Sequence, residues 1–468
     1  MPMALQEALE AYRANSVQAF RFDMSVSHEP LGSALGSPSG SVKSASEALS
    51  SIFGCDRSWI TSMGSTTSNH VCMAYIGRMF PGKPVLVTAN PHLSLVNSAV
   101  DFNVPLRFVP IEFEPAFELP VLPSAKLVKG CLGEFPDVAA IVVTSPTYEG
   151  LNADAESITH LVRQVHPNIP IFFDNAWGWG LDTPLAHGAD VVVRSSHKMD
   201  GAWQGGGVLL AQEAHVDIDV LSQCVSARFS TSQSYPILAS VEMCYGLWHH
   251  FGPTLSRCFS AWSDEIRTLL ADAGIEVLDE DKISQFRDSG QVAFLDKRKI
   301  TFSSKPKTGF ELSEVIHETA HYIPEKAGIS NVTLIASLKA LSLDPTEVAE
   351  NILKCIDAPF PEKTKDSNSP DRSPTNMMPP LCLNKWEELR VLEAHEAVRR
   401  ETERVPLEEA SDRIAAELIT PYPPGIPIII PGQRITDEGI EYIRLLCSLG
   451  GDVVAEDASM KEIRVVAS

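Results

Sequence analysis

The sequence has no long apolar run and no regularly paired cysteines. No stretch approaches the roughly 18 apolar residues that a membrane span needs, so we expect a soluble protein that does not enter a membrane. The cysteines show neither CxxC spacing nor a disulfide pattern, which is typical of a reducing, cytoplasmic compartment. The nine cysteines are Cys55, Cys72, Cys131, Cys224, Cys244, Cys258, Cys355, Cys382 and Cys447.

Basic residues are also scarce. The 38 Lys and Arg residues stand against 60 Asp and Glu, a formal net charge of −22. This charge repels nucleic acid and anionic membranes, so the expected partner is a small molecule. Residues 1–20 form a polar amphipathic pattern without the apolar centre of a signal peptide. The length of 468 residues predicts two or three domains.

Short apolar runs alternate with amphipathic helical patterns through the first half of the chain. Such alternation predicts crossover connections and an α/β fold, with a mainly parallel sheet covered on both faces. The return run at 204–210 enters through a glycine turn. The predicted strands are 58–62, 84–88, 138–143, 169–173 and 189–193, and the predicted helices are 44–53, 70–79 and 155–165.

The pattern then changes to mixed helix and strand, with strands expected at 291–295 and 299–303 and a helical region at 384–418. Residues 361–380 are polar and proline-rich, as expected of a linker. We therefore predict five parts. They are an N-terminal segment (1–55), a large cofactor-binding domain (56–252), a small α+β domain (253–360), the linker (361–380) and a C-terminal helical or α+β region (381–468).

Two charged residues follow the ends of neighbouring predicted strands. Asp174 ends the strand at 169–173, and Lys198 comes shortly after the strand at 189–193. Open α/β sheets bind ligands at the carboxyl ends of their strands. Pyridoxal phosphate needs a lysine that forms a Schiff base and a carboxylate that keeps its ring nitrogen protonated. Taken alone, the lysine would be interpreted as a surface residue and the aspartate as a helix cap. Taken together, the two residues predict this cofactor.

A phosphate-binding loop is predicted at residues 63–69, where glycine and hydroxyl residues open a helix. Free backbone N–H groups, hydroxyl donors and the positive end of the helix dipole converge at such a position. The alternative interpretation is a helix cap without a ligand.

A zinc-protease pattern, HExxH, occurs at His317, Glu318 and His321. Pro324 ends this helix soon afterwards, and no third ligand follows at a recognisable spacing. We therefore expect a solvated helix face and no metal. The residues expected on the buried stripe of this helix are Leu312, Val315, Ile316 and Thr319.

Several stretches, in order, resemble the fold-type I ornithine/lysine/arginine decarboxylase family of pyridoxal-phosphate enzymes. They are 64–69, 147–150, 195–198, 229–235, 421–427 and 430–432. The resemblance implies an aspartate aminotransferase-like large domain with a mainly parallel sheet, plus a smaller α+β C-terminal domain. It also implies decarboxylation of arginine, lysine or ornithine to the amine and CO₂.

The resemblance further implies the roles of individual residues. Lys198 is the Schiff-base lysine, Asp174 pairs with the ring nitrogen, and His92 stacks on the ring. Ala176 packs against the other ring face. The phosphate is held by Ser65, Thr66, Ser195 and His197, while Thr231 and Ser232 reach the phosphate of a partner subunit in a homodimer or higher even oligomer.

The sequence departs from the family beside these positions. Asn175 and Trp177 stand where the family has glutamate and histidine, and Leu93 follows His92. Trp177 removes a proton donor, so oxidation, cyclisation, elimination or transamination of a related amino acid is the alternative outcome. The substrate candidates are Trp177, Trp203 and Tyr148. The two tryptophans could cover a cationic side chain or simply pack. A pseudoenzyme is disfavoured because Lys198 and Asp174 are both present.

Overall fold

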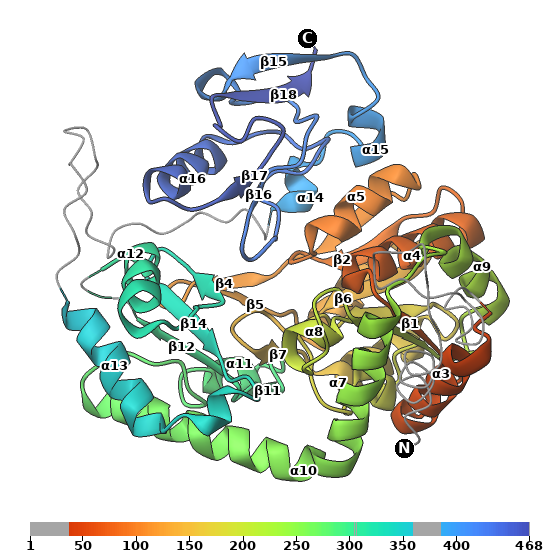
Figure 1. The fold of residues 1–468 in the computed structure, drawn as a ribbon. Helices are drawn as coiled ribbons and strands as arrows, with labels where there is room; N and C mark the ends of the chain where they lie inside the picture. The colour runs from red at the N-terminus through yellow and green to blue at the C-terminus, as the bar shows by residue number, and fades with distance from the viewer. Residues whose placement is uncertain (1–36, 304, 306, 359–384, 468) are drawn as a thin grey trace, which may run out of the picture.

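The computed structural model describes residues 37–303, 305, 307–358 and 385–467. The amphipathic pattern at 1–20 and the linker at 361–380 lie outside the described residues. Figure 1 shows a large α/β unit, a smaller unit joined to it by one long helix, and a C-terminal unit beside the large one. No helix in the described part of the chain is long and apolar enough to cross a membrane.

The central sheet has seven strands within the described residues, in the order β1-β10-β9-β8-β6-β2-β3. β10 runs antiparallel to both of its neighbours, β1 and β9, and the other six strands point in the same direction. The expected α/β fold with a mainly parallel sheet is therefore confirmed. The strands are β1 (Arg57–Thr61), β2 (Val85–Thr88), β3 (Leu106–Val109), β6 (Ala140–Thr144), β8 (Ile171–Asp174), β9 (Val191–Arg194) and β10 (Gly207–Ala211).

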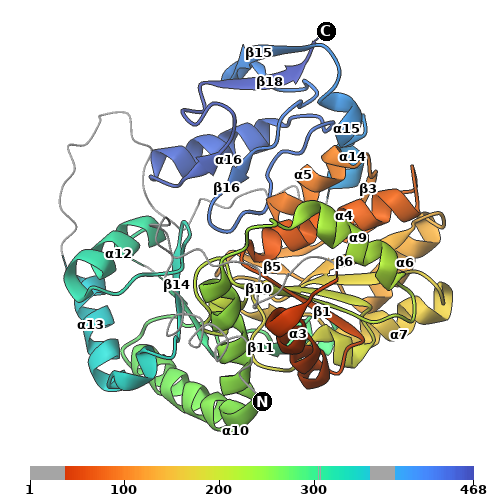
Figure 2. The same cartoon turned by 45° about the vertical axis from the view of Figure 1, so that its right-hand side comes forward.

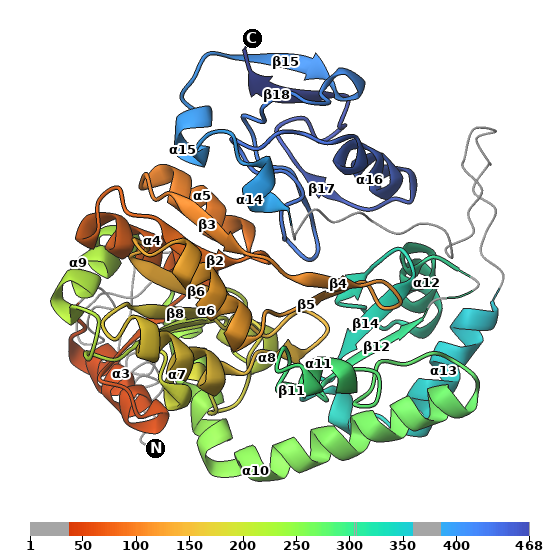
Figure 3. The same ribbon diagram turned by 180° about the vertical axis from the view of Figure 1, so that it is seen from behind.

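Each face of the sheet packs into its own hydrophobic core, because successive strand residues point to opposite faces. Phe172 of β8 belongs to one core, and its neighbour Phe173 belongs to the other. The helices α4 (Gly64–Met79), α5 (Leu93–Asp101) and α9 (Ile218–Arg228) contribute to the Phe172 core. The helices α3 (Gly40–Phe53), α6 (Ala125–Glu134) and α7 (Ala155–Val165) cover the other face (Figures 2 and 3).

One continuous helix, α10 (Tyr235–Asp272), joins the large and small units (Figure 1). The predicted boundary between residues 252 and 253 falls inside it, since Pro253 lies within the helix. The first half of α10 packs on the large core through Leu238 and Trp248. Its second half contributes Ile266 to a separate core in the small unit. The boundary between the two cores thus lies inside a helix, so a search of the sequence for loop-forming segments could not locate it.

The small unit is an α+β arrangement. An antiparallel sheet has the strand order β12-β14-β13, packed with α12 (Gly309–Val315) and α13 (Pro345–Asp357). Its strands are β12 (Lys299–Ser303), β13 (Lys326–Ala327) and β14 (Asn331–Ile335). The strand predicted at 299–303 is confirmed. The strand predicted at 291–295 shrinks to β11 (Phe294–Leu295), which pairs with β7 (Leu151–Asn152) of the large unit.

The HExxH stretch does not form the α-helical turn that a zinc site requires. Residues Ile316–Ala320 form a π-helical turn, and His321 takes a left-handed conformation with φ 57°. His317 and His321 are both exposed. The expected burial of Leu312, Val315 and Ile316 is confirmed, whereas that of Thr319 is wrong because the π turn rotates it into solvent. The described residues contain no group of three His, Cys, Asp or Glu side chains that could hold a metal ion.

The prediction of a helical region at 384–418 is wrong. Two four-residue helices, α14 (Trp386–Leu389) and α15 (Ala394–Ala397), are followed by β15 (Thr402–Pro406). This strand pairs with β18 (Glu462–Val466), so long-range pairing overrides the local helical tendency of its charged residues. This unit also contains the 3-10 helix η6 (Leu407–Glu409), α16 (Asp437–Ser448), β16 (Thr420–Pro421) and β17 (Val453–Val454).

Candidate active site

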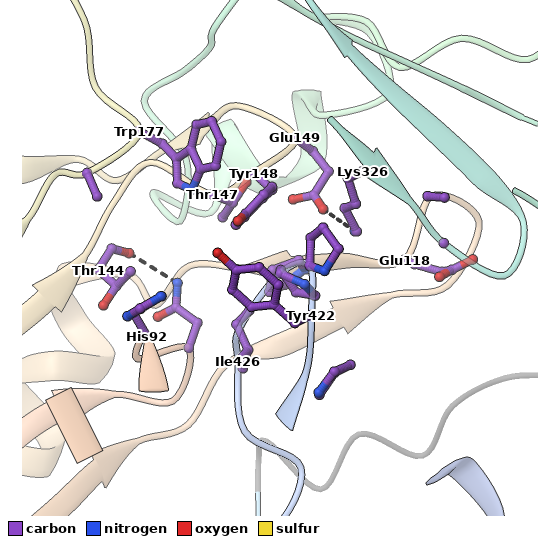
Figure 4. A pocket seen from close by; sticks show the side chains of 18 of the residues that line it. His92, Glu118, Thr144, Thr147, Tyr148, Glu149, Trp177, Lys326, Tyr422 and Ile426 are labelled. Carbon is purple, nitrogen blue, oxygen red and sulfur yellow. Dashed lines mark hydrogen bonds and ion pairs between the residues drawn. The ribbon is translucent and has the colours of Figure 1, made fainter. Parts of the chain in front are cut away.

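A pocket lies at the carboxyl ends of the central parallel strands, where all three units meet. Its walls include Ala176 after β8, His92 before α5, Lys326 of β13 and Tyr422 after β16. Figure 4 shows side chains from these elements converging on one cavity. The C-terminal unit closes the pocket through the backbone, because Leu93 N donates to Gly425 O at 3.0 Å.

Asp174 lies at the base of the pocket and is 3% exposed. Its Oδ2 accepts a hydrogen bond from Asn69 Nδ2 at 2.9 Å, and its Oδ1 accepts from Ala176 N at 3.2 Å. Asn69 also donates to Ser94 Oγ at 3.0 Å, which orients the amide. No ion pair to Asp174 is present in the described part of the chain. A buried carboxylate without a cation is costly, so the site fits a ligand that brings a protonated ring nitrogen.

Lys198 extends from the short helix α8 (Ser196–Met199), which follows β9. Its Nζ lies 4.2 Å from the centre of the Trp177 ring and 5.9 Å from that of Tyr148. Burial lowers the pKa of Lys198, while the charges of Asp174 and Glu325 oppose the shift. A lowered pKa increases the fraction of neutral amine at neutral pH, which is the nucleophilic form.

His92 is the N-cap of α5, and its Nδ1 accepts a hydrogen bond from Ser94 N at 3.2 Å. Burial is the largest influence on His92 and lowers its pKa, so the imidazole is neutral at neutral pH. Gly425 of the C-terminal unit packs closely against the His92 ring, because a Cβ atom built onto this glycine would lie 3.2 Å from the ring. The ring is therefore fixed by its own helix start and by the C-terminal unit.

The phosphate loop predicted at 63–69 forms the first turn of α4, which begins at Gly64, six residues earlier than expected. Ser195 Oγ donates to Ser65 Oγ at 2.7 Å, which joins the two predicted phosphate-binding segments. His197 Nδ1 lies 2.9 Å from Gly206 O, and Thr66 is exposed. The hydroxyl groups of Ser65 and Ser195 thus meet at the positive end of a sixteen-residue helix, which suits a phosphate.

Two of the substrate candidates form an aromatic wall. The rings of Tyr148 and Trp177 are 4.3 Å apart, and Trp177 lines the pocket beside Ala176. Behind them, the fully buried Lys299 donates to Thr147 O at 3.0 Å. Burial lowers the pKa of Lys299 to about 8. Lys299 also donates to Trp177 O at 3.4 Å, and its Nζ lies 5.2 Å from the centre of the Trp177 ring, so Trp177 contacts both Lys198 and Lys299.

The other predicted residues lie outside this pocket in the single chain. Trp203 is 62% exposed, and Thr231 and Ser232 are exposed just before α10. Their segment packs near the phosphate loop of its own chain, since Gln233 Oε1 accepts from Ser62 N at 2.7 Å. The roles of these three residues remain predictions.

Several lining residues were not found from the sequence. Asn69 was recognised only as part of the phosphate loop, although it holds Asp174. Glu149 was recognised only as part of the family-like turn at 147–150. Tyr422 was recognised only as part of the family-like stretch at 421–427. Lys326 comes from the small unit, and no local pattern marks it as a pocket residue.

Two family models match the chain. The model described as "Orn/Lys/Arg decarboxylase, major domain" matches residues 12–252, just over half of the chain, and the C-terminal domain model matches 387–452. The chain belongs to the Orn/Lys/Arg decarboxylase family. Its large unit therefore has the fold-type I architecture of pyridoxal-phosphate enzymes, and the chain is a pyridoxal-phosphate-dependent lyase. The fit of Asp174, Lys198 and the phosphate loop agrees with this cofactor.

Named relatives are similar over nearly the whole chain. The arginine decarboxylase of Bacillus subtilis is 26% identical over 449 residues, covering 94% of this chain and 88% of the relative. The constitutive lysine decarboxylase of Escherichia coli is 24% identical over 519 residues, covering 92% and 71%. The solved structure of that enzyme superposes with a TM-score of 0.76 at 20% identity, covering all of this chain and 82% of the other.

Proposed function

We propose that this chain decarboxylates a basic amino acid (arginine, lysine or ornithine), giving the amine and CO₂. The observation that carries the proposal is the convergence of Lys198, Asp174 and His92 in one pocket. The chain belongs to a family whose named relatives include arginine and lysine decarboxylases.

The bound cofactor supplies an electron sink for the bond that breaks at the substrate Cα. Asp174, held by Asn69 and the Ala176 backbone, keeps the ring nitrogen protonated. His92 would pack against the ring and limit its tilt. Lys198 Nζ would hold the cofactor between turnovers and could return a proton to Cα.

The pocket also favours loss of the carboxylate by excluding water. Trp177, Tyr148, Pro146 and Ile426 contribute apolar surface to its lining. In such surroundings the anionic carboxylate is destabilised because it loses its hydrating water, whereas neutral CO₂ is not. The aromatic wall therefore supports decarboxylation even though Trp177 stands where the family has histidine.

The alternative outcome remains oxidation, cyclisation, elimination or transamination of a related amino acid, and Trp177 is the reason to test it. We expect each turnover of a basic amino acid to release one CO₂ and one amine, detected by mass spectrometry together with assays for ammonia and peroxide. A product that keeps its carboxylate would contradict decarboxylation. The variant Trp177→His would then show whether this position diverts the reaction.

The exposed positions of Thr231, Ser232 and Trp203 support a second part of the proposal, a homodimer or higher even oligomer. In the dimer, Thr231 and Ser232 would hold the partner's phosphate, while Trp203 remains a substrate candidate. A cytoplasmic location is also proposed. It is supported by the eight cysteines of the described residues, which are all free.

We expect light scattering to give the mass of a dimer or a multiple of it. Thr231→Ala combined with Ser232→Ala should weaken cofactor binding by at least about tenfold, because two hydrogen bonds to the anionic phosphate are lost. The exposed pair Thr254→Ala and Ser226→Ala serves as a matched control and should leave cofactor affinity unchanged. A fully active monomer at the assay concentration would refute the shared site.

A further inference from the structure

An ion pair bridges the large and small units inside the pocket. Glu149 follows β6 in the turn before β7, and its Oε1 accepts a hydrogen bond from Lys326 Nζ of β13. Glu149 is only 1% exposed, and Lys326 is also buried. This contact fixes the orientation of the Glu149 carboxylate, because one of its two oxygens is committed to the lysine.

The other oxygen, Glu149 Oε2, is buried and has no hydrogen-bond partner among the described residues. A buried carboxylate oxygen without a donor is unfavourable, so its position calls for a ligand or a structural reason. Figure 4 shows the Glu149 carboxylate directed toward the interior of the cavity. His92 lies at the opposite end of the view, with Tyr422 between them. Glu149 and His92 thus line different parts of the pocket.

The pocket carries more negative than positive charge. Its charged lining residues in the described chain are Glu118, Glu149, Asp174, Asp452, Lys198 and Lys326. Glu118 is already occupied, since its oxygens accept from Ile329 N at 3.0 Å and Ser330 N at 2.5 Å. Asp452 is exposed at the C-terminal wall. Glu149 is thus the buried carboxylate of this lining that still has an acceptor to offer.

We propose that Glu149 Oε2 accepts a hydrogen bond from the distal cationic group of the substrate and so selects for basic amino acids. Lys326 is a positioning residue that aims the carboxylate through Oε1. The inference rests on the proposed function, because it supposes that an amino acid is attached at the Lys198 end. A charge-assisted hydrogen bond in a desolvated pocket is stronger than the same contact in water. Tyr148 and Tyr422 line the same pocket and provide aromatic surface for the side chain of the substrate.

The test measures binding by titrating the visible absorption of the cofactor-loaded protein. The probes are arginine against its uncharged isostere citrulline, and lysine against norleucine. The wild-type protein should bind the cationic member of at least one pair more tightly. In Glu149→Gln, affinity for that cation should fall about 10- to 100-fold, as for loss of a hydrogen bond between charged groups, while affinity for the neutral isostere stays within about twofold.

Glu325→Gln is the matched control. Glu325 is exposed, does not line the pocket, and yet acts on Lys198 through its charge. It should keep the preference for the cation, because Glu149 Oε2 is still present. Both variants lose one negative charge near the site, so the comparison separates that loss from the loss of the Glu149 carboxylate. Equal weakening of both probes in Glu149→Gln, or loss of the preference in Glu325→Gln, would overturn the inference.

Product analysis separates this inference from the proposed function. If Glu149→Gln abolishes the preference for the cation while wild-type turnover yields a product that retains its carboxylate, the assignment of Glu149 stands and decarboxylation fails. A wild-type protein that binds citrulline as tightly as arginine, and norleucine as tightly as lysine, overturns the assignment, whatever the product.

Discussion

Lys198→Ala is expected to abolish measurable turnover, lowering kcat by at least about 10³-fold, because it removes both the covalent anchor of the cofactor and the amine placed at Cα. The wild-type protein should be yellow, and borohydride should bleach it while leaving the cofactor attached to the peptide that contains Lys198. In the variant, borohydride should fix no label.

Lys297→Ala is a suitable control for the first prediction. Lys297 is a half-exposed lysine paired with Asp264 in the small unit, and it does not line the pocket. Its variant should keep the colour, the label and the rate. A protein that stays colourless when pyridoxal phosphate is added, or a label that survives in Lys198→Ala, would contradict the assignment of Lys198.

Asp174→Asn is expected to lower kcat by about 10²- to 10⁴-fold, with a smaller loss of cofactor affinity. The amide keeps the size of the side chain but removes the negative charge that stabilises a protonated ring nitrogen. The hydrogen bonds from Asn69 and Ala176 N would then meet an amide in place of a carboxylate. Steady-state rates and cofactor titration of the same preparation separate the two effects.

Asp182→Asn provides a control with the same chemical change. Asp182 is an exposed residue outside the pocket, so its variant should match the wild-type protein in rate and affinity. If Asp174→Asn retained a rate within about threefold of wild type, the buried carboxylate would have no electronic role in the reaction.

The local sequence predicted the central sheet well because its signals are local. Apolar runs marked β8 and β9. Asp174 at the end of β8 and Lys198 shortly after β9 were correctly placed at one sheet edge. The helix α7 was predicted with its observed bounds. Helical propensity failed at 384–418, where β15 forms because it pairs with β18 near the end of the chain.

What the sequence by itself determined was the position of the residues predicted to hold the cofactor. Lysine, aspartate and the phosphate loop each lie next to a strand or a helix start that their own neighbours specify. The distal end was decided only by tertiary structure. Glu149 and Lys326 are 177 residues apart and belong to different units, and Asn69 meets Asp174 across 105 residues. Such partners are chosen by how the units pack around α10, and no periodicity or motif within either segment encodes that packing.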